Sequence, residues 1–215
     1  MAMQAECPRC PSRVDEQDGG WACPLHGATA PLWRTLGADY EGLARHLETA
    51  GGMPSWSPWP LPASWSICDF GAVRPAGPHA SATFVTCSGM TDTDGVVTLT
   101  VVTEEPGVGL GARVSGAVHD DPGSQMQDRP AQTRVRVGGA SIPLWLLDTG
   151  EEVAPEDDPW DRAVLVGEAR GRWLWLVVAP ASAALGIGGW GRLEDLGSRG
   201  PELVDLPFAE RPSDW

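Results

Sequence analysis

Four residues near the start of the chain constrain its fold most strongly: Cys7, Cys10, Cys23 and His26. They form a Cys-x-x-Cys pair and a Cys-x-x-His pair that are separated by twelve residues. Each pair can close a tight turn that directs two ligand atoms to one point, and two such turns complete a tetrahedron. Three thiolates and one imidazole are typical of a structural zinc site, whereas a catalytic zinc keeps a position open for water. The pattern therefore predicts one structural zinc ion.

Two alternatives for these cysteines are a redox dithiol and coincidental spacing. The paired spacings and a Gly19-Gly20 turn between them favour zinc. Residues 1–34 contain few aliphatic side chains and cannot bury a core of their own, so a metal would have to order them. We therefore expect a small zinc-ribbon-like head over residues 1–34.

The cellular location is inferred from what the sequence lacks. Residues 1–7 have neither the basic nor the apolar region of a signal peptide, and the longest apolar run, residues 173–179, has seven residues. A membrane-spanning helix needs about 20. The five cysteines are an odd number, which argues against complete disulfide pairing. We expect a cytoplasmic protein with no membrane contact.

The charge of the chain disfavours nucleic acid as a partner. Fifteen basic residues, all arginine, stand against 29 acidic residues, which gives a net charge of −14. Such a chain repels phosphate backbones over long distances. The predicted head contains three arginines and four acidic residues, so it has no basic stripe either.

Residues 35–65 are predicted to form a linker helix followed by an extended segment. Apolar side chains recur at helical spacing between residues 36 and 47, Asp39 can cap a helix start, and Gly51-Gly52 can end it. This predicts a helix over residues 39–50. Residues 54–65 contain too many prolines for a helix or an inner strand, which indicates an extended strap across the surface.

Residues 66–215 indicate a mainly antiparallel β body of about six to eight strands, with few short helices, and hence an α+β fold. Turn residues separate three pairs of strand-like segments, predicting hairpins from residues 81–88 and 96–103, 133–137 and 141–147, and 163–169 and 172–178. A short helix is expected near residues 180–185. The acidic segment 148–161 is interpreted as a solvated surface loop.

Tryptophan is unusually frequent, with eleven residues against one tyrosine and three phenylalanines. Trp56, Trp59 and Trp65 fall within ten residues of one another. Such rings can form an aromatic binding groove for a ligand, but they can equally pack into the core. We favour packing of the strap against the body and keep the groove as the alternative.

A second candidate site combines Glu104 and Glu105 with the glycine-rich loop Gly107–Gly111. The loop reads Gly-x-Gly-x-Gly, whereas a dinucleotide fingerprint requires Gly-x-Gly-x-x-Gly within a βαβ unit, so a connecting loop is the simpler interpretation. Paired carboxylates could perform acid–base chemistry if one were desolvated. Their side chains should point to opposite faces of a strand, which weakens the pair.

Several segments together resemble a known family. The Cys/His head, the Trp-x-Pro-Trp-Pro-Leu-Pro segment at 56–62, residues 107–113 and Trp173-Leu-Trp175 resemble an uncharacterised family from high-GC Gram-positive bacteria. The resemblance spans most of the chain and implies a cytoplasmic protein of unknown function with a zinc-ribbon-like head. It supplies no catalytic residue or substrate. The acidic segment 148–161 is longer than the connection expected in that family.

Three classes of function remain. A zinc-stabilised binding or adaptor module with a protein partner accounts for a closed metal site and the lack of a known catalytic motif. One alternative is an enzyme that binds a small molecule in a groove near Glu104, Glu105 and the Gly107–Gly111 loop. The second alternative is a nucleic-acid-associated zinc ribbon.

Overall fold

A computed structural model of the chain describes residues 3–17, 19–117, 120–126, 129–148, 161–189 and 192–211. Within these ranges lie fourteen strands, three α-helices and three 3-10 helices. The predicted acidic loop at 148–161 falls outside the described residues except for its two ends.

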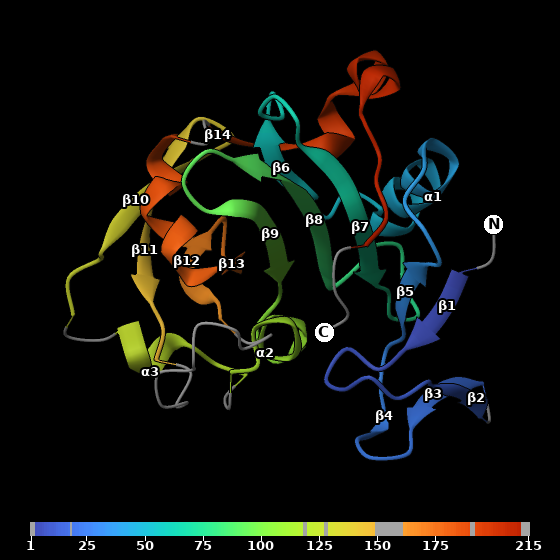
Figure 1. Cartoon of the computed structure of the whole chain (residues 1–215). Helices are drawn as coiled ribbons and strands as arrows, with labels where there is room; N and C mark the ends of the chain where they lie inside the picture. The colour runs from blue at the N-terminus through green and yellow to red at the C-terminus, as the bar shows by residue number, and fades with distance from the viewer. Residues whose placement is uncertain are drawn as a thin grey trace.

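Eleven strands form one large sheet (Figure 1). In spatial order they are β1 (Met3–Glu6), β5 (Leu32–Thr35), β7 (Ser66–Val73), β8 (Ala82–Thr91), β9 (Gly95–Glu104), β13 (Arg172–Ala179), β12 (Ala163–Ala169), β11 (Ala140–Leu146), β10 (Thr133–Val137), β14 (Arg192–Asp195) and β6 (Trp56–Trp59).

All neighbours in the large sheet are antiparallel except the parallel pair β10 and β14. The predicted mainly antiparallel α+β fold is therefore confirmed. The described part of residues 66–215 contains eight strands, β7 to β14, which agrees with the expected six to eight. The strands β1, β5 and β6, which precede the predicted body, were not expected, because each has only four residues, too few for a clear alternating pattern.

The cysteine-containing segment folds as a small sheet of three strands, β2 (Asp15–Gln17), β3 (Gly20–Cys23) and β4 (Gly27–Ala28). Figure 1 shows this sheet beside β1 and β5, with β10 on the opposite side of the molecule. The strands that precede and follow it along the chain, β1 and β5, pair with each other in the large sheet. The head is thus attached to the body at both of its ends.

The predicted helix at 39–50 is confirmed as α1 (Tyr40–Ala50). The Asp39 side chain accepts a hydrogen bond from the Gly42 N–H at 2.6 Å, and Gly51 adopts the left-handed conformation that ends the helix. The other helices are α2 (Leu110–Ser115), α3 (Gly123–Met126) and the 3-10 helices η1 (Ala181–Gly189), η2 (Leu196–Ser198) and η3 (Gly200–Asp205). The helix predicted near residue 180 is η1.

The three predicted hairpins are all present, as β8–β9, β10–β11 and β12–β13. In the first hairpin the strands are longer than predicted. Residues 89–91, assigned to the loop from the sequence, pair with residues 95–97 in β9. The turn is consequently reduced to residues 92–94.

Apolar side chains pack on both faces of the large sheet. One cluster includes Trp56, Trp65 and Leu99, and the other includes Val102, Leu110 and Trp175. Because successive strand residues point to opposite faces, β9 contributes to both clusters.

Residues 56–59 of the predicted strap form the edge strand β6, a position that tolerates proline. Trp56 and Trp65 are each only 3% exposed. The Trp65 ring lies against Gly89, where an added Cβ would come within 2.3 Å of it. These two tryptophans are core residues, in agreement with the packing interpretation.

Candidate metal centre and its contacts with the sheet

Cys7, Cys10, Cys23 and His26 converge in the head. Their ligand atoms all lie within 4.8 Å of one another. The Sγ atoms of Cys10 and Cys23 are 3.6 Å apart, and Nδ1 of His26 lies 3.5 Å from Sγ of Cys7 and 3.6 Å from Sγ of Cys23. Cys7 and Cys23 are buried, whereas His26 is exposed. The sequence therefore located all four residues of a cluster that can hold a metal ion.

The donor set fits zinc. Bonds of about 2.3 Å to sulfur and about 2.1 Å to nitrogen, arranged tetrahedrally, place neighbouring ligands roughly 3.6–3.8 Å apart. The short distances in the cluster match this value. The backbone N–H of Arg9 donates to Cys7 Sγ and that of Leu25 to Cys23 Sγ, each at 3.4 Å. Such bonds stabilise thiolates and set the turn geometry of both Cys-x-x pairs.

Burial raises the pKa of the Cys7 thiol to about 11, although the Arg9 N–H opposes the shift. Burial also acts on Cys23, but hydrogen bonds from the N–H groups of Leu25 and His26 and from the thiols of Cys7 and Cys10 together outweigh it, so the pKa of Cys23 lies below its ordinary value. Metal binding requires thiolates, so it would release protons from this cluster.

Two arginines connect the first cysteine pair to the large sheet. Arg9 donates to the carbonyls of Gly107 at 2.6 Å and Val108 at 3.2 Å. Arg113 of α2 donates to the Cys7 carbonyl and to the Glu6 carboxylate, both at 2.5 Å. The Cys-x-x-Cys turn is thus positioned by the glycine-rich loop and by the helix that follows it.

A buried ionic network continues from this contact into the sheet. Asp69 accepts from Arg34 Nε at 2.8 Å and Nη2 at 2.5 Å, and Arg211 Nε lies 3.1 Å from the same carboxylate oxygen. Arg34 also lies 3.9 Å from Glu6. Arg34 and Asp69 are 4% and 2% exposed, so each needs the other's charge.

The glycines of the 107–111 loop have structural roles. Gly109 precedes α2 with a φ of 84°, a conformation that other residues rarely adopt. Gly111 faces the indole of Trp175, to which an added Cβ would come within 2.2 Å. This close packing, together with the cover provided by Arg9, supports the interpretation of a connecting loop.

Replacing Gly111 by alanine should therefore lower the free energy of unfolding by about 1–3 kcal/mol, because the new methyl group overlaps a fully buried ring. Chemical denaturation measures this loss. Gly20→Ala is the matched control, since its nearest neighbour is 3.8 Å away. Equal stability of both variants would contradict the packing role.

Glu104 and Glu105 behave differently. Glu104 is 1% exposed and its Oε2 accepts from the Leu110 N–H at 2.8 Å, whereas Glu105 is exposed. Burial raises the pKa of Glu104 to about 7, although the N–H groups of Gly111 and Leu110 oppose the shift. Neither glutamate lines any of four cavities that the described residues form. The two carboxyl groups therefore lie in different environments, one buried and one exposed.

Glu104 should make stability depend on pH. The folded protein keeps this proton up to about pH 7, whereas an unfolded glutamate releases it near 4.5. Stability is therefore lost as the pH rises between these values, by about 3 kcal/mol. Glu104→Gln should be close to wild type at pH 5 and more stable by up to that amount at pH 8. A constant difference in unfolding free energy across this range would contradict the assignment.

The structure does not bring the predicted groove residues together. Trp56 and Trp65 belong to the apolar cluster on one face of the sheet. Glu104 contacts α2, whose Leu110 belongs to the cluster on the other face. Trp59 alone among the three tryptophans is partly exposed. An aromatic groove formed by all three rings is therefore not present in the described structure.

The fold and the cluster define the class: a mainly antiparallel β protein with a Cys3His head capable of holding a metal. The chain belongs to a family of unknown function, since the model of the Family of unknown function (DUF6758) matches residues 1–213. This confirms the resemblance to an uncharacterised family. No curated protein and no solved structure gives a match. Among the described residues, no helix combines the length and apolar character needed to span a membrane.

Proposed function

We propose that the protein is a cytoplasmic binding or adaptor module whose head is folded by one structural zinc ion and whose partner is another protein. The observation that carries this proposal is the convergence of three sulfurs and one imidazole nitrogen within 4.8 Å. Four protein ligands fill a tetrahedral zinc ion and leave no position for a substrate or water. The metal would therefore shape a surface.

The contacts of the head support a structural role for the metal. The first cysteine pair is held by Arg9 and Arg113, which link it to the glycine-rich loop and to α2. A metal that orders this turn also fixes how the head presents its surface next to the sheet. This is the behaviour expected of a recognition module.

The enzyme alternative has one observation in its favour, the pKa of Glu104 near neutrality. It is weakened because Glu104 is buried and already accepts a hydrogen bond from α2. The nucleic-acid alternative is weakened further. Of the three head arginines, Arg9 and Arg34 are engaged by carbonyls and by Asp69.

Two measurements test the proposal. Protein purified after metal-replete expression should contain one zinc per chain by elemental analysis, and Cys10→Ser should lower that content. Chemical cross-linking followed by affinity capture from native cells should then recover a partner protein with the wild type. A reaction abolished by Glu104→Gln, with no captured protein, would replace the binding module by the enzyme.

A further inference from the structure

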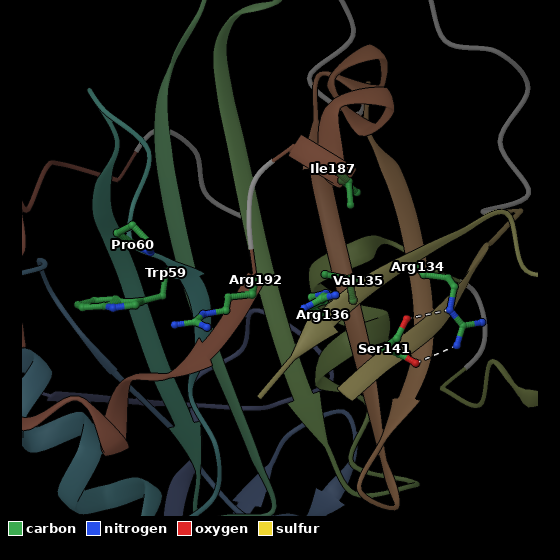
Figure 2. A pocket seen from close by; sticks show the side chains of 8 residues that line it. All are labelled: Trp59, Pro60, Arg134, Val135, Arg136, Ser141, Ile187 and Arg192. Carbon is green, nitrogen blue, oxygen red and sulfur yellow. Dashed lines mark hydrogen bonds between the residues drawn. The ribbon is translucent and has the colours of Figure 1, made fainter. Parts of the chain in front are cut away.

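Three arginines gather on one face of the sheet, far from the head. The strand register aligns Ser141 with Arg136, Arg136 with Arg192, and Arg192 with Trp59 across β11, β10, β14 and β6. Arg134 lies two residues from Arg136 and so points to the same face. We call Arg134, Arg136 and Arg192 the basic row. Figure 2 shows Arg192 and Arg136 between Trp59 and Ser141, with Arg134 on the other side of Ser141.

The basic row lines an open cavity of about 570 Å³. Its three arginines are exposed, while two of the apolar residues that line it, Val135 and Ile187, are buried members of an apolar cluster of the sheet. The remaining lining residues are Trp59, Pro60 and Ser141. The cavity thus combines cations with an apolar wall.

The charges of the basic row are only partly compensated. Within the described residues the Arg136 side chain has no hydrogen bond or ion pair. Arg192 Nε lies 2.8 Å from Glu194, but the other oxygen of that carboxylate accepts from Arg199 at 2.9 Å. Like charges on adjacent strands destabilise a sheet unless a counter-charge bridges them. In a chain with a net charge of −14, this face carries a local positive excess.

Parts of the site are oriented in advance. Arg134 donates through Nε to the Ser141 hydroxyl and through Nη2 to its carbonyl, both at 2.9 Å. At the other end, the Arg199 guanidinium lies 5.6 Å from the centroid of the Trp59 ring. Both ends therefore lose little side-chain freedom when a ligand binds.

We propose that the basic row binds a short acidic segment of a partner protein in an extended conformation. Carboxylates would bridge Arg136 and Arg192, and an adjacent apolar side chain would contact Trp59 and Pro60. Four strands about 4.8 Å apart span roughly 14 Å, which is the length of about four extended residues. This inference rests on the proposed binding function and names the surface and the partner chemistry.

Charge complementarity favours a short acidic peptide over nucleic acid. Arginine binds carboxylates through paired hydrogen bonds, and two or three carboxylates suffice to neutralise the basic row. A nucleic acid would extend its phosphates beyond three arginines onto a chain with a net charge of −14. The positive area is matched to a short ligand.

The test uses zinc-loaded full-length protein and a fluorescently labelled peptide, Gly-Glu-Phe-Glu-Glu-Gly, in an anisotropy titration. The same peptide with glutamine in place of glutamate is the matched probe and should bind at least about tenfold more weakly. Affinity for the glutamate peptide should fall as salt rises from about 50 to about 200 mM.

The protein variants locate the binding. The double variant Arg136→Glu with Arg192→Glu should lower the affinity for the glutamate peptide at least about tenfold. The single variant Arg136→Gln should lower this affinity less. The single variant keeps the test interpretable if the double variant misfolds. Thermal melts check that both variants are folded. Arg13→Glu changes the charge of an exposed arginine in the head and should leave affinity unchanged.

Four results would overturn the inference. The first two are equal binding of both peptides and no binding of the glutamate peptide at about 1 mM. The third is unchanged affinity in the double variant. The fourth is displacement of the labelled peptide by pyrophosphate or a short single-stranded DNA at lower concentrations than by the unlabelled glutamate peptide. A partner captured equally well by the wild type and the double variant would leave the binding module intact and reject the basic row alone.

Discussion

Replacing Asp69 by alanine should lower the free energy of unfolding by about 3–5 kcal/mol, because it leaves a buried charge without its counter-ion. Arg34 is 4% exposed and directs two N–H groups at this carboxylate. Arg211 loses an ion pair at the same time. Denaturant titration at neutral pH measures the loss.

Asp205 provides the control for this experiment. It is exposed, and Asp205→Ala should change stability by less than about 0.5 kcal/mol. If Asp69→Ala cost no more than Asp205→Ala, the ionic network would contribute nothing to the fold. A double variant that also removes Arg34 should recover part of the loss, since no buried charge then remains unpaired.

Removing the zinc ion that we propose should unfold the head while the large sheet persists. Among the described residues, the apolar cluster of the head has three buried members, Cys7, Val14 and Cys23, so a bound metal would supply much of the free energy that orders β2–β4. Structural zinc supplies about 10–16 kcal/mol of apparent binding free energy in small domains at neutral pH. Chelation or Cys23→Ser should make residues 7–31 sensitive to protease.

Hydrogen exchange measured by mass spectrometry distinguishes unfolding of the head from unfolding of the large sheet. Amides of β7, β8 and β9 should stay protected after chelation, whereas those of β3 should exchange rapidly. Cys68→Ala is the control, because this buried thiol lies outside the cluster and its loss should leave the metal content unchanged. A head that resists protease equally with and without chelator would show that the metal does not fold it.

Features encoded by neighbouring residues could be predicted from the sequence. Helix α1 follows from apolar spacing and from Asp39 and Gly51, which form the caps. The hairpins follow from Gly138-Gly139 and from Arg170-Gly171, which occupy the tight turns. The Cys/His cluster could be predicted for the same reason. Each pair of ligands lies in one local turn, so the fold has to bring only two turns together.

Features that depend on distant partners could not be predicted. Arg34 and Asp69 are 35 residues apart, and Glu6 and Arg113 are 107 apart, so nothing near either residue indicates its partner. The alignment of Arg136 with Arg192 likewise requires the parallel pairing of β10 and β14.

The environment of His46 was also missed. It is 1% exposed, its Nε2 lies 2.8 Å from the Ser55 hydroxyl, and burial lowers its pKa to about 3.

The position of β6 at the edge of the sheet has a consequence for synthesis of the chain. Its partner β14 lies far downstream, with Asp195 opposite Trp56. The residues that enclose Trp56, among them Gly138 and Arg170, also follow it by a long interval. A nascent chain therefore emerges from the ribosome with this indole uncovered and keeps it so until the chain has been translated past residue 195. Completion of the sheet is a late event, and chains interrupted before β14 present the uncovered strand to chaperones and proteases.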